Sequence, residues 1–150
     1  MSQPPRYAPN SPFPPYAYQP GQTPHPRNHP DGHSRDAPEY IGPALTEQNW
    51  SQCTAYLYGV DLFNHGYYWE AHEAWEGLWK RAPRASPGSH LLQGLIQLAA
   101  MRIKERAGNE RGAHKLRQKA LDHLQRAGLH MGLPTLYDGT SVPNQLILDL

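Results

Sequence analysis

The uneven distribution of proline constrains this chain more than any other feature. Twelve of the 16 prolines lie in residues 1–43, together with only five tyrosines and phenylalanines. Proline removes a backbone donor and fixes φ, and so few apolar side chains cannot offset the entropy lost on ordering. The sequence therefore predicts a disordered, partly polyproline-like tail over residues 1–43 and a folded domain over residues 44–150. Removing residues 1–40 should then leave the melting temperature nearly unchanged.

Composition narrows the functions open to the chain. The formal net charge is +1, which gives no basic field to attract nucleic acid. No apolar run approaches the roughly 20 residues that a membrane-spanning helix needs, and the N-terminus has no signal-peptide pattern. The one cysteine, Cys53, cannot form an internal disulfide or a two-thiol zinc site. These features predict a cytoplasmic protein without membrane or nucleic-acid partners, and they leave a protein partner or a homo-oligomer open.

Apolar side chains recur every three to four residues in four segments, which is typical of helices with one buried face. Gly66 and Gly108 end two of these segments, since glycine adopts the positive φ common at a helix C-terminus. The predicted helices cover residues 46–63, 67–80, 89–106 and 110–127, and a short one has Pro143 in its first turn. No alternating strand pattern is present. The predicted fold class is all-α, a compact multihelical bundle of four to five helices.

A weak internal sequence repeat indicates how the helices pair. The spacing Gly66-x-x-x-x-Ala71-His72 recurs 42 residues later, starting at Gly108. In both places a glycine turn leads into a helix. The bundle is therefore predicted to consist of two packed helical hairpins.

The segment WEAHEAWEGLW, which starts at Trp69, sets polar groups among three tryptophans. At about 100° per residue, His72 and Glu76 share one edge of the helix, between Trp69 and Trp79. Glu76 is therefore predicted to be half-buried. Glu70 lies further round the helix and is predicted to reach water.

The next helix supplies a polar counterpart. In LLQGLIQLAAMRIKER, apolar residues occupy nearly the whole circumference, and one stripe of Gln93, Gln97 and Lys104 interrupts them. An unpaired buried polar group costs about 1 to 3 kcal/mol, so this stripe needs partners. We expect it to face His72 and Glu76 across a helix–helix contact, forming a polar pocket walled by the two flanking tryptophans.

Three sequence blocks carry a family resemblance. GVDLFNHGYYWEAHEAWEGLW, LLQGLIQLAA with a lysine seven residues after Gln97, and GNERGAHKLRQKALDHL together resemble the bacterial and archaeal domain of unknown function family numbered 309. The match covers about residues 55–127 and implies a compact, multihelical cytosolic domain, sometimes labelled a predicted metal-dependent hydrolase. The proline-rich tail and the end at Leu150 depart from the family pattern. The motif positions are Glu70, His72, Glu73, Glu76, Trp79, Gln93, Gln97 and Lys104.

A divalent metal is the first chemistry that the cluster suggests. His72 and Glu76 lie at i and i+4 on one helix face, a spacing that can hold one ion as the two histidines of H-E-x-x-H do. Glu76 replaces the second histidine of that motif. A further ligand would have to come from His65, His90 or His114.

The second chemistry that the cluster suggests is acid–base catalysis without a metal. Glu76 would orient His72 as a general base, while Lys104 and the glutamines hold an anionic or amide substrate. The candidate catalytic residues are thus His72, Glu76 and Lys104, and the candidate ligand-binding residues are Gln93, Gln97, Glu73, Trp69 and Trp79.

Two non-catalytic roles fit the same residues. The polar cluster can be a closed hydrogen-bond network that fixes helix register. The domain can also be a helical-hairpin interaction module, since NHGYYWEA resembles the turn of tetratricopeptide repeats. Such an array needs about three repeats of 34 residues, for which this chain has no room. The sequence therefore leaves both an enzyme and an interaction protein open.

Overall fold

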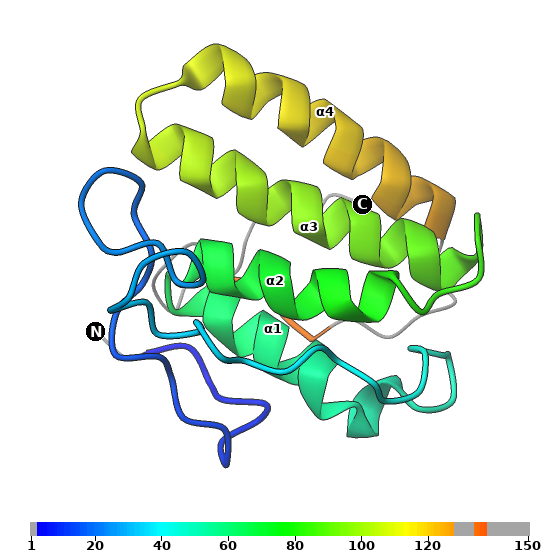
Figure 1. The fold of residues 1–150 in the computed structure, drawn as a ribbon. Coiled ribbons are helices and arrows are strands. Elements are labelled where there is room, and N and C mark those ends of the chain that lie inside the picture. The colour runs from blue at the N-terminus through cyan, green and yellow to red at the C-terminus, as the bar shows by residue number, and fades with distance from the viewer. Residues whose placement is uncertain (1–2, 128–133, 138–150) are drawn as a thin grey trace.

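A computed structural model describes residues 3–127 and 134–137. Its helices pack in chain order, α1 against α2, α2 against α3 and α3 against α4 (Figure 1). No β-strand forms within these two ranges, so the all-α prediction is confirmed. The elements are a 3-10 helix η1 over Trp50–Gln52, then α1 over Thr54–Asn64, α2 over Tyr68–Trp79, α3 over Pro87–Arg106 and α4 over Glu110–Ala127.

The helix predicted over residues 46–63 is shorter in the structure. Thr46 and Asn49 hydrogen-bond each other, Thr46 N donating to Asn49 Oδ1 at 2.8 Å and Asn49 N donating to Thr46 Oγ1 at 3.1 Å. This local turn leads into η1. Cys53 is then extended, with φ −83° and ψ 98°, so α1 starts only at the next residue. The short helix predicted around Pro143 lies outside the described residues.

Local signals placed the other boundaries well. Gly66 and Gly108 have φ of +90° and +77°, a backbone conformation that other residues rarely adopt. At α3 the Ser86 side chain accepts a hydrogen bond from Ser89 N, and Pro87 occupies the first turn. Proline fits there because its missing N–H has no helical partner in any case. The helix therefore begins two residues before the predicted start.

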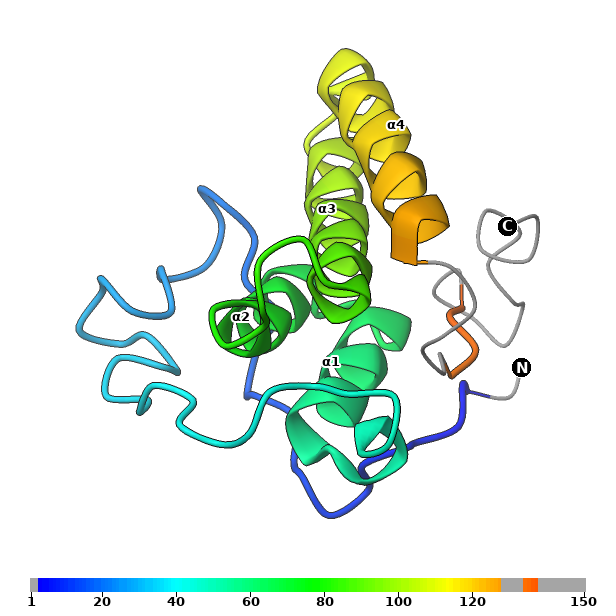
Figure 2. The same cartoon turned by 90° about the vertical axis from the view of Figure 1, so that its right-hand side faces the viewer.

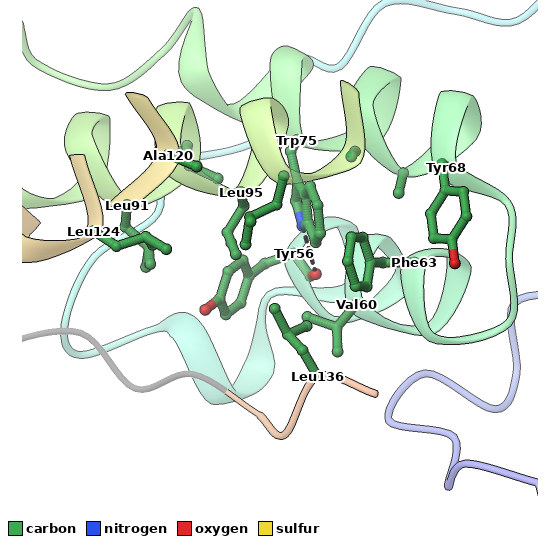
Figure 3. Packing of buried hydrophobic residues seen from close by; sticks show 14 of the residues in the cluster. Tyr56, Val60, Phe63, Tyr68, Trp75, Leu91, Leu95, Ala120, Leu124 and Leu136 are labelled. Carbon is green, nitrogen blue, oxygen red and sulfur yellow. Dashed lines mark hydrogen bonds between the residues drawn. The ribbon is translucent and has the colours of Figure 1, made fainter. Parts of the chain in front are cut away.

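Aromatic side chains of α1 and α2 build the centre of the core (Figure 3). Trp75 is fully buried, and its Nε1 donates to Tyr56 O at 3.2 Å. Phe63 lies beside it with ring centroids 6.1 Å apart. Leu136, from the short stretch after α4, is also buried in this core. The indole of Trp75 thus fills the space between the two helices, and its polar atom is satisfied.

Replacing Gly59 with alanine is expected to destabilise the protein by about 1 to 3 kcal/mol. A Cβ at this position would lie 2.6 Å from Trp75 Cδ1 and 2.7 Å from Cε2. This overlap outweighs the roughly 1 kcal/mol by which alanine is the better helix former. Thermal unfolding of the full chain measures the effect. In a Trp75→Phe background the same substitution should cost less, and equal cost in both backgrounds would contradict this explanation.

The proline-rich segment lies against the bundle. Figure 2 shows it on the side of α1 and α2 that faces away from α4. Tyr58 OH donates to Pro12 O at 2.6 Å, and Phe13 stacks on Tyr67 with centroids 5.0 Å apart. Apart from short turns it follows an irregular path, as expected for its composition. The disorder predicted for residues 1–43 is not confirmed.

Candidate functional site

One buried carboxylate on α1 anchors the start of the N-terminal segment. Asp61 has no exposed surface, and its Oδ2 accepts from Arg6 Nε at 2.9 Å and from Ala8 N at 2.8 Å. Its Oδ1 accepts from Tyr7 N at 2.8 Å. Three donors on two oxygens satisfy a buried charge. This contact is structural, and it fixes the path that leads the segment to α2.

A second buried carboxylate lies on α2, where the sequence predicted exposure. Glu70 is only 5% exposed. Its Oε2 accepts from His33 Nε2 at 2.6 Å and from Tyr18 N at 2.9 Å. The prediction that Glu70 reaches water is wrong because the N-terminal segment covers this side of the helix. Within the described residues, Glu70 Oε1 is buried and has no hydrogen-bond partner.

The imidazole of His33 links this carboxylate to a hydroxyl. Its Nδ1 lies 2.7 Å from Ser34 Oγ, while Nε2 faces Glu70. A carboxylate only accepts, so Nε2 carries the proton. In the neutral ring Nδ1 is then an acceptor, and the Ser34 hydroxyl donates to it. The three side chains form one directed hydrogen-bond chain from Ser34 through His33 to Glu70.

A groove of about 1020 Å³ lies beside these hydrogen-bonded side chains, between the N-terminal segment, α1 and α2. We call it the α1–α2 groove. Ser34 and Glu70 line it, as do Trp69, Glu73 and Glu76 of α2. The groove therefore joins the buried pair to the outer carboxylates of α2.

Aromatic rings and one ion pair surround Trp69 and its neighbours. Trp69 makes edge contacts with Tyr18 and His25, both with centroids 5.6 Å apart. Arg27 Nε lies 3.4 Å from Glu73 Oε1. The predicted wall residue Trp69 and the predicted ligand residue Glu73 thus contact the N-terminal segment.

The pair predicted from i, i+4 spacing is present on the edge of α2. His72 Nε2 lies 3.2 Å from Glu76 Oε2, with side chains 25% and 37% exposed. His72 Nδ1 donates to Trp69 O at 2.9 Å. That bond leaves Nε2 as the nitrogen that can take up or release a proton beside Glu76. Solvent reaches both groups.

The polar stripe of α3 differs in exposure along its length. Gln93 and Gln97 are half-buried, whereas Lys104 is exposed. Gln97 Oε1 and Trp79 Nε1 are both buried and lack partners within the described part of the chain. No hydrogen bond or ion pair among the described residues joins the stripe to the His72–Glu76 pair. The grouping of these residues into one pocket stays a prediction.

The donor set at His72 and Glu76 does not fit a catalytic metal. Catalytic zinc sites use three protein ligands, and no group of three or more histidine, cysteine, aspartate or glutamate side chains converges within residues 3–127 and 134–137. Of the further ligands considered, His90 contacts His123 instead. His65 lies against Phe13 with the two rings tilted by 45°, and burial lowers the pKa of His65.

A histidine pair connects α3 and α4. His90 Nδ1 lies 3.1 Å from His123 Nδ1, and the rings stack with centroids 5.3 Å apart. Burial lowers the pKa of His123, and the neighbouring His90 lowers it further. This contact is not predictable from sequence because it joins two helices at positions with no local spacing in common.

Two members of the hydrogen-bond chain that sequence reasoning missed, His33 and Ser34, come from the N-terminal segment. His33 reaches Glu70 from 37 positions away in the sequence, and Ser34 contacts His33. One signal was available: histidines stand at 25, 29 and 33, a regular four-residue spacing in a segment otherwise rich in proline. Composition led to the prediction of disorder, and the spacing was not used.

The bundle and its α2 motif define a small multihelical domain. The family described as "Domain of unknown function (DUF309)" matches residues 56–116, which confirms the resemblance. The match includes the motif positions of α2 and α3 and leaves out the N-terminal segment. No curated protein and no solved structure gave a match. None of the helices that the structure describes combines the length and apolarity needed to cross a membrane. The cytoplasmic location stays a prediction.

Proposed function

We propose that the domain binds a small polar ligand along the edge between α2 and α3. His72 and Glu76 contribute one side of the site, and Gln93, Gln97 and Lys104 contribute the other. Trp69 and Trp79 border it, as the sequence predicted.

One observation carries this proposal. α2 and α3 pack together, and each has a buried polar atom without a partner among the described residues, the donor Trp79 Nε1 and the acceptor Gln97 Oε1. Leaving such atoms unpaired costs about 1 to 3 kcal/mol each. An amide offers one acceptor and one donor, the two kinds of partner that these atoms lack. A compound with an amide group is therefore the class of ligand that the edge favours.

The remaining groups add charge and a proton acceptor. His72 and Glu76 are reachable from solvent, as binding requires. Lys104 is exposed near the end of α3 and supplies positive charge for an anionic group on the ligand. Hydrolase-like chemistry would use His72 Nε2 as the base, with the ring held by its Nδ1 bond to Trp69 O and its protonated form favoured by Glu76. This chemistry extends the binding proposal and depends on it.

The indole resonance of Trp79 tests the proposal. On titration with N-methylacetamide, the Trp79 Nε1–H signal in a nitrogen–proton correlation spectrum should shift, because the amide carbonyl accepts from it. Gln97→Leu should weaken this shift at least threefold, since it removes the acceptor for the amide N–H. Gln118→Leu, a matched change at an exposed position of α4, should not. A Trp79 signal that stays unmoved in every titration would exclude this site.

A second candidate function is peptide binding by the face of α1 and α2. One observation favours it: residues 3–43 of the same chain already lie on this face in irregular conformation, with Arg6, His33 and Phe13 inserted between its polar and aromatic groups. A proline-rich segment of a partner could be recognised in the same way.

A further inference from the structure

We propose that Ser34 is a nucleophile activated by His33 and Glu70, and that the α1–α2 groove is a site for hydrolysis of small carboxylic esters. The groove shares Trp69 and Glu76 with the edge of α2 near α3, but Ser34, His33 and Glu70 belong to the groove side alone. It therefore does not rest on the ligand site proposed above.

The hydrogen-bond directions are those that activate a serine. Glu70 Oε2 accepts from Tyr18 N and His33 Nε2, and the second bond holds the His33 ring in one orientation. The Ser34 hydroxyl points its proton at His33 Nδ1, with 2.7 Å between the heavy atoms. A nucleophile, a base and a third group that orients the base define this class of site. Both distances, 2.7 and 2.6 Å, lie within the range for proton transfer.

The hydrogen-bond chain of Ser34, His33 and Glu70 is more buried than an ordinary ion pair on a protein surface. The side chains of His33 and Glu70 are 2% and 4% exposed. Bulk water is therefore kept from the contact between His33 Nε2 and Glu70, which strengthens that contact. Ser34 lines the groove in which a substrate would bind. Glu70 also lines the groove. Its buried Oε1 has no hydrogen-bond partner among the described residues.

The reaction proceeds in two balanced halves. Ser34 Oγ bonds to the ester carbonyl carbon while its proton moves to His33 Nδ1, and the carbonyl π electrons move onto oxygen. When those electrons return, the bond to the alcohol oxygen breaks, and the alcohol leaves with the proton from Nδ1. Water then repeats both steps on the acyl-serine. The carboxylic acid departs and the Ser34 hydroxyl is restored.

The lining of the groove selects the class of ester. Ser34 N already donates to Pro26 O at 2.9 Å, so another donor must meet the oxyanion, and Arg27 lines the groove. Glu39, Glu73 and Glu76 also line it and disfavour an anionic substrate.

Aromatic side chains complete this lining. Tyr40, Tyr58 and Trp69 present rings to the groove, and such rings bind apolar or cationic groups. The expected substrate is a small ester that is neutral or positively charged.

A fluorophosphonate reagent tests the proposal on the full-length chain. Ser34 Oγ should bond to phosphorus with release of fluoride, giving one adduct per chain in the intact mass and one modified peptide that contains Ser34. Ser34→Ala should remove the adduct, and His33→Gln should slow its formation about 100-fold. Ser51→Ala, at an exposed serine, should label at the wild-type rate. No adduct at Ser34, or labelling that ignores the loss of His33, would overturn the proposal.

A second variant keeps the test decisive if His33→Gln does not fold. In Ser34→Cys the thiol should react with iodoacetamide at least tenfold faster than Cys53, because His33 takes its proton. Equal reaction rates at the two thiols would count against activation. Gln97→Leu should leave the fluorophosphonate rate unchanged, which separates this site from the one between α2 and α3.

Discussion

Deleting residues 1–40 is expected to lower the free energy of unfolding by about 3 kcal/mol. The deletion removes Arg6, Tyr7 and Ala8, which donate to Asp61, and His33, which donates to Glu70. Hydrogen bonds to charged groups contribute about 1.5 to 3 kcal/mol each. Rehydration of the carboxylates and release of the ordered segment offset part of this loss. The melting temperature should fall by on the order of 10 °C.

Calorimetry on the full-length and shortened chains measures this effect. Adding a synthetic peptide of residues 3–43 should restore part of the lost stability, because binding to the folded state alone stabilises it. Restoration in trans would also support the peptide-binding alternative. If the shortened chain melts within about 2 °C of the full chain, composition alone described the tail correctly and the contacts with α1 and α2 contribute little.

Asp61→Asn in the full-length chain is expected to destabilise by about 3 kcal/mol, as much as the deletion. The deletion returns Asp61 to water, whereas the point substitution leaves three donors facing a buried side chain that has lost its charge. The amide also turns one of its own donors toward Arg6 Nε and the backbone N–H groups of Tyr7 and Ala8, which are donors themselves. Arg6, whose side chain is 25% exposed, also loses its ion-pair partner.

Denaturant unfolding measures this loss, and a matched variant on α4 controls for the change in net charge. Asp122 forms an ion pair with Arg126 at 3.3 Å in which both side chains are more than half exposed. Asp122→Asn should change the stability by less than about 0.5 kcal/mol. Similar losses in the two variants would show that the burial of Asp61 does not matter to folding.

The helices could be predicted because their signals are local. The apolar spacing of α2 and α4 and the turns at Gly66 and Gly108 each depend on a few neighbouring residues. The start of α1 was missed by eight residues, because the hydrogen bonds between Thr46 and Asn49 favour a turn over a helix there.

The contacts at the candidate sites also differ in whether local sequence spacing predicts them. The His72–Glu76 pair was predictable, since i and i+4 positions on a helix are neighbours. The contact of His33 with Glu70 was not, because no rule of local spacing connects a proline-rich segment to a helix face 37 residues away.

The sequence by itself determined the helices, the two glycine turns, the family resemblance and the polar edge of α2. Tertiary structure alone decided which carboxylates are buried. Glu70 and Asp61 become partners of the N-terminal segment only when that segment lies across α1 and α2. The physical reason is that burial and charge pairing depend on what covers a helix face. Helical periodicity tells which side chains share that face, and only packing tells what lies against it.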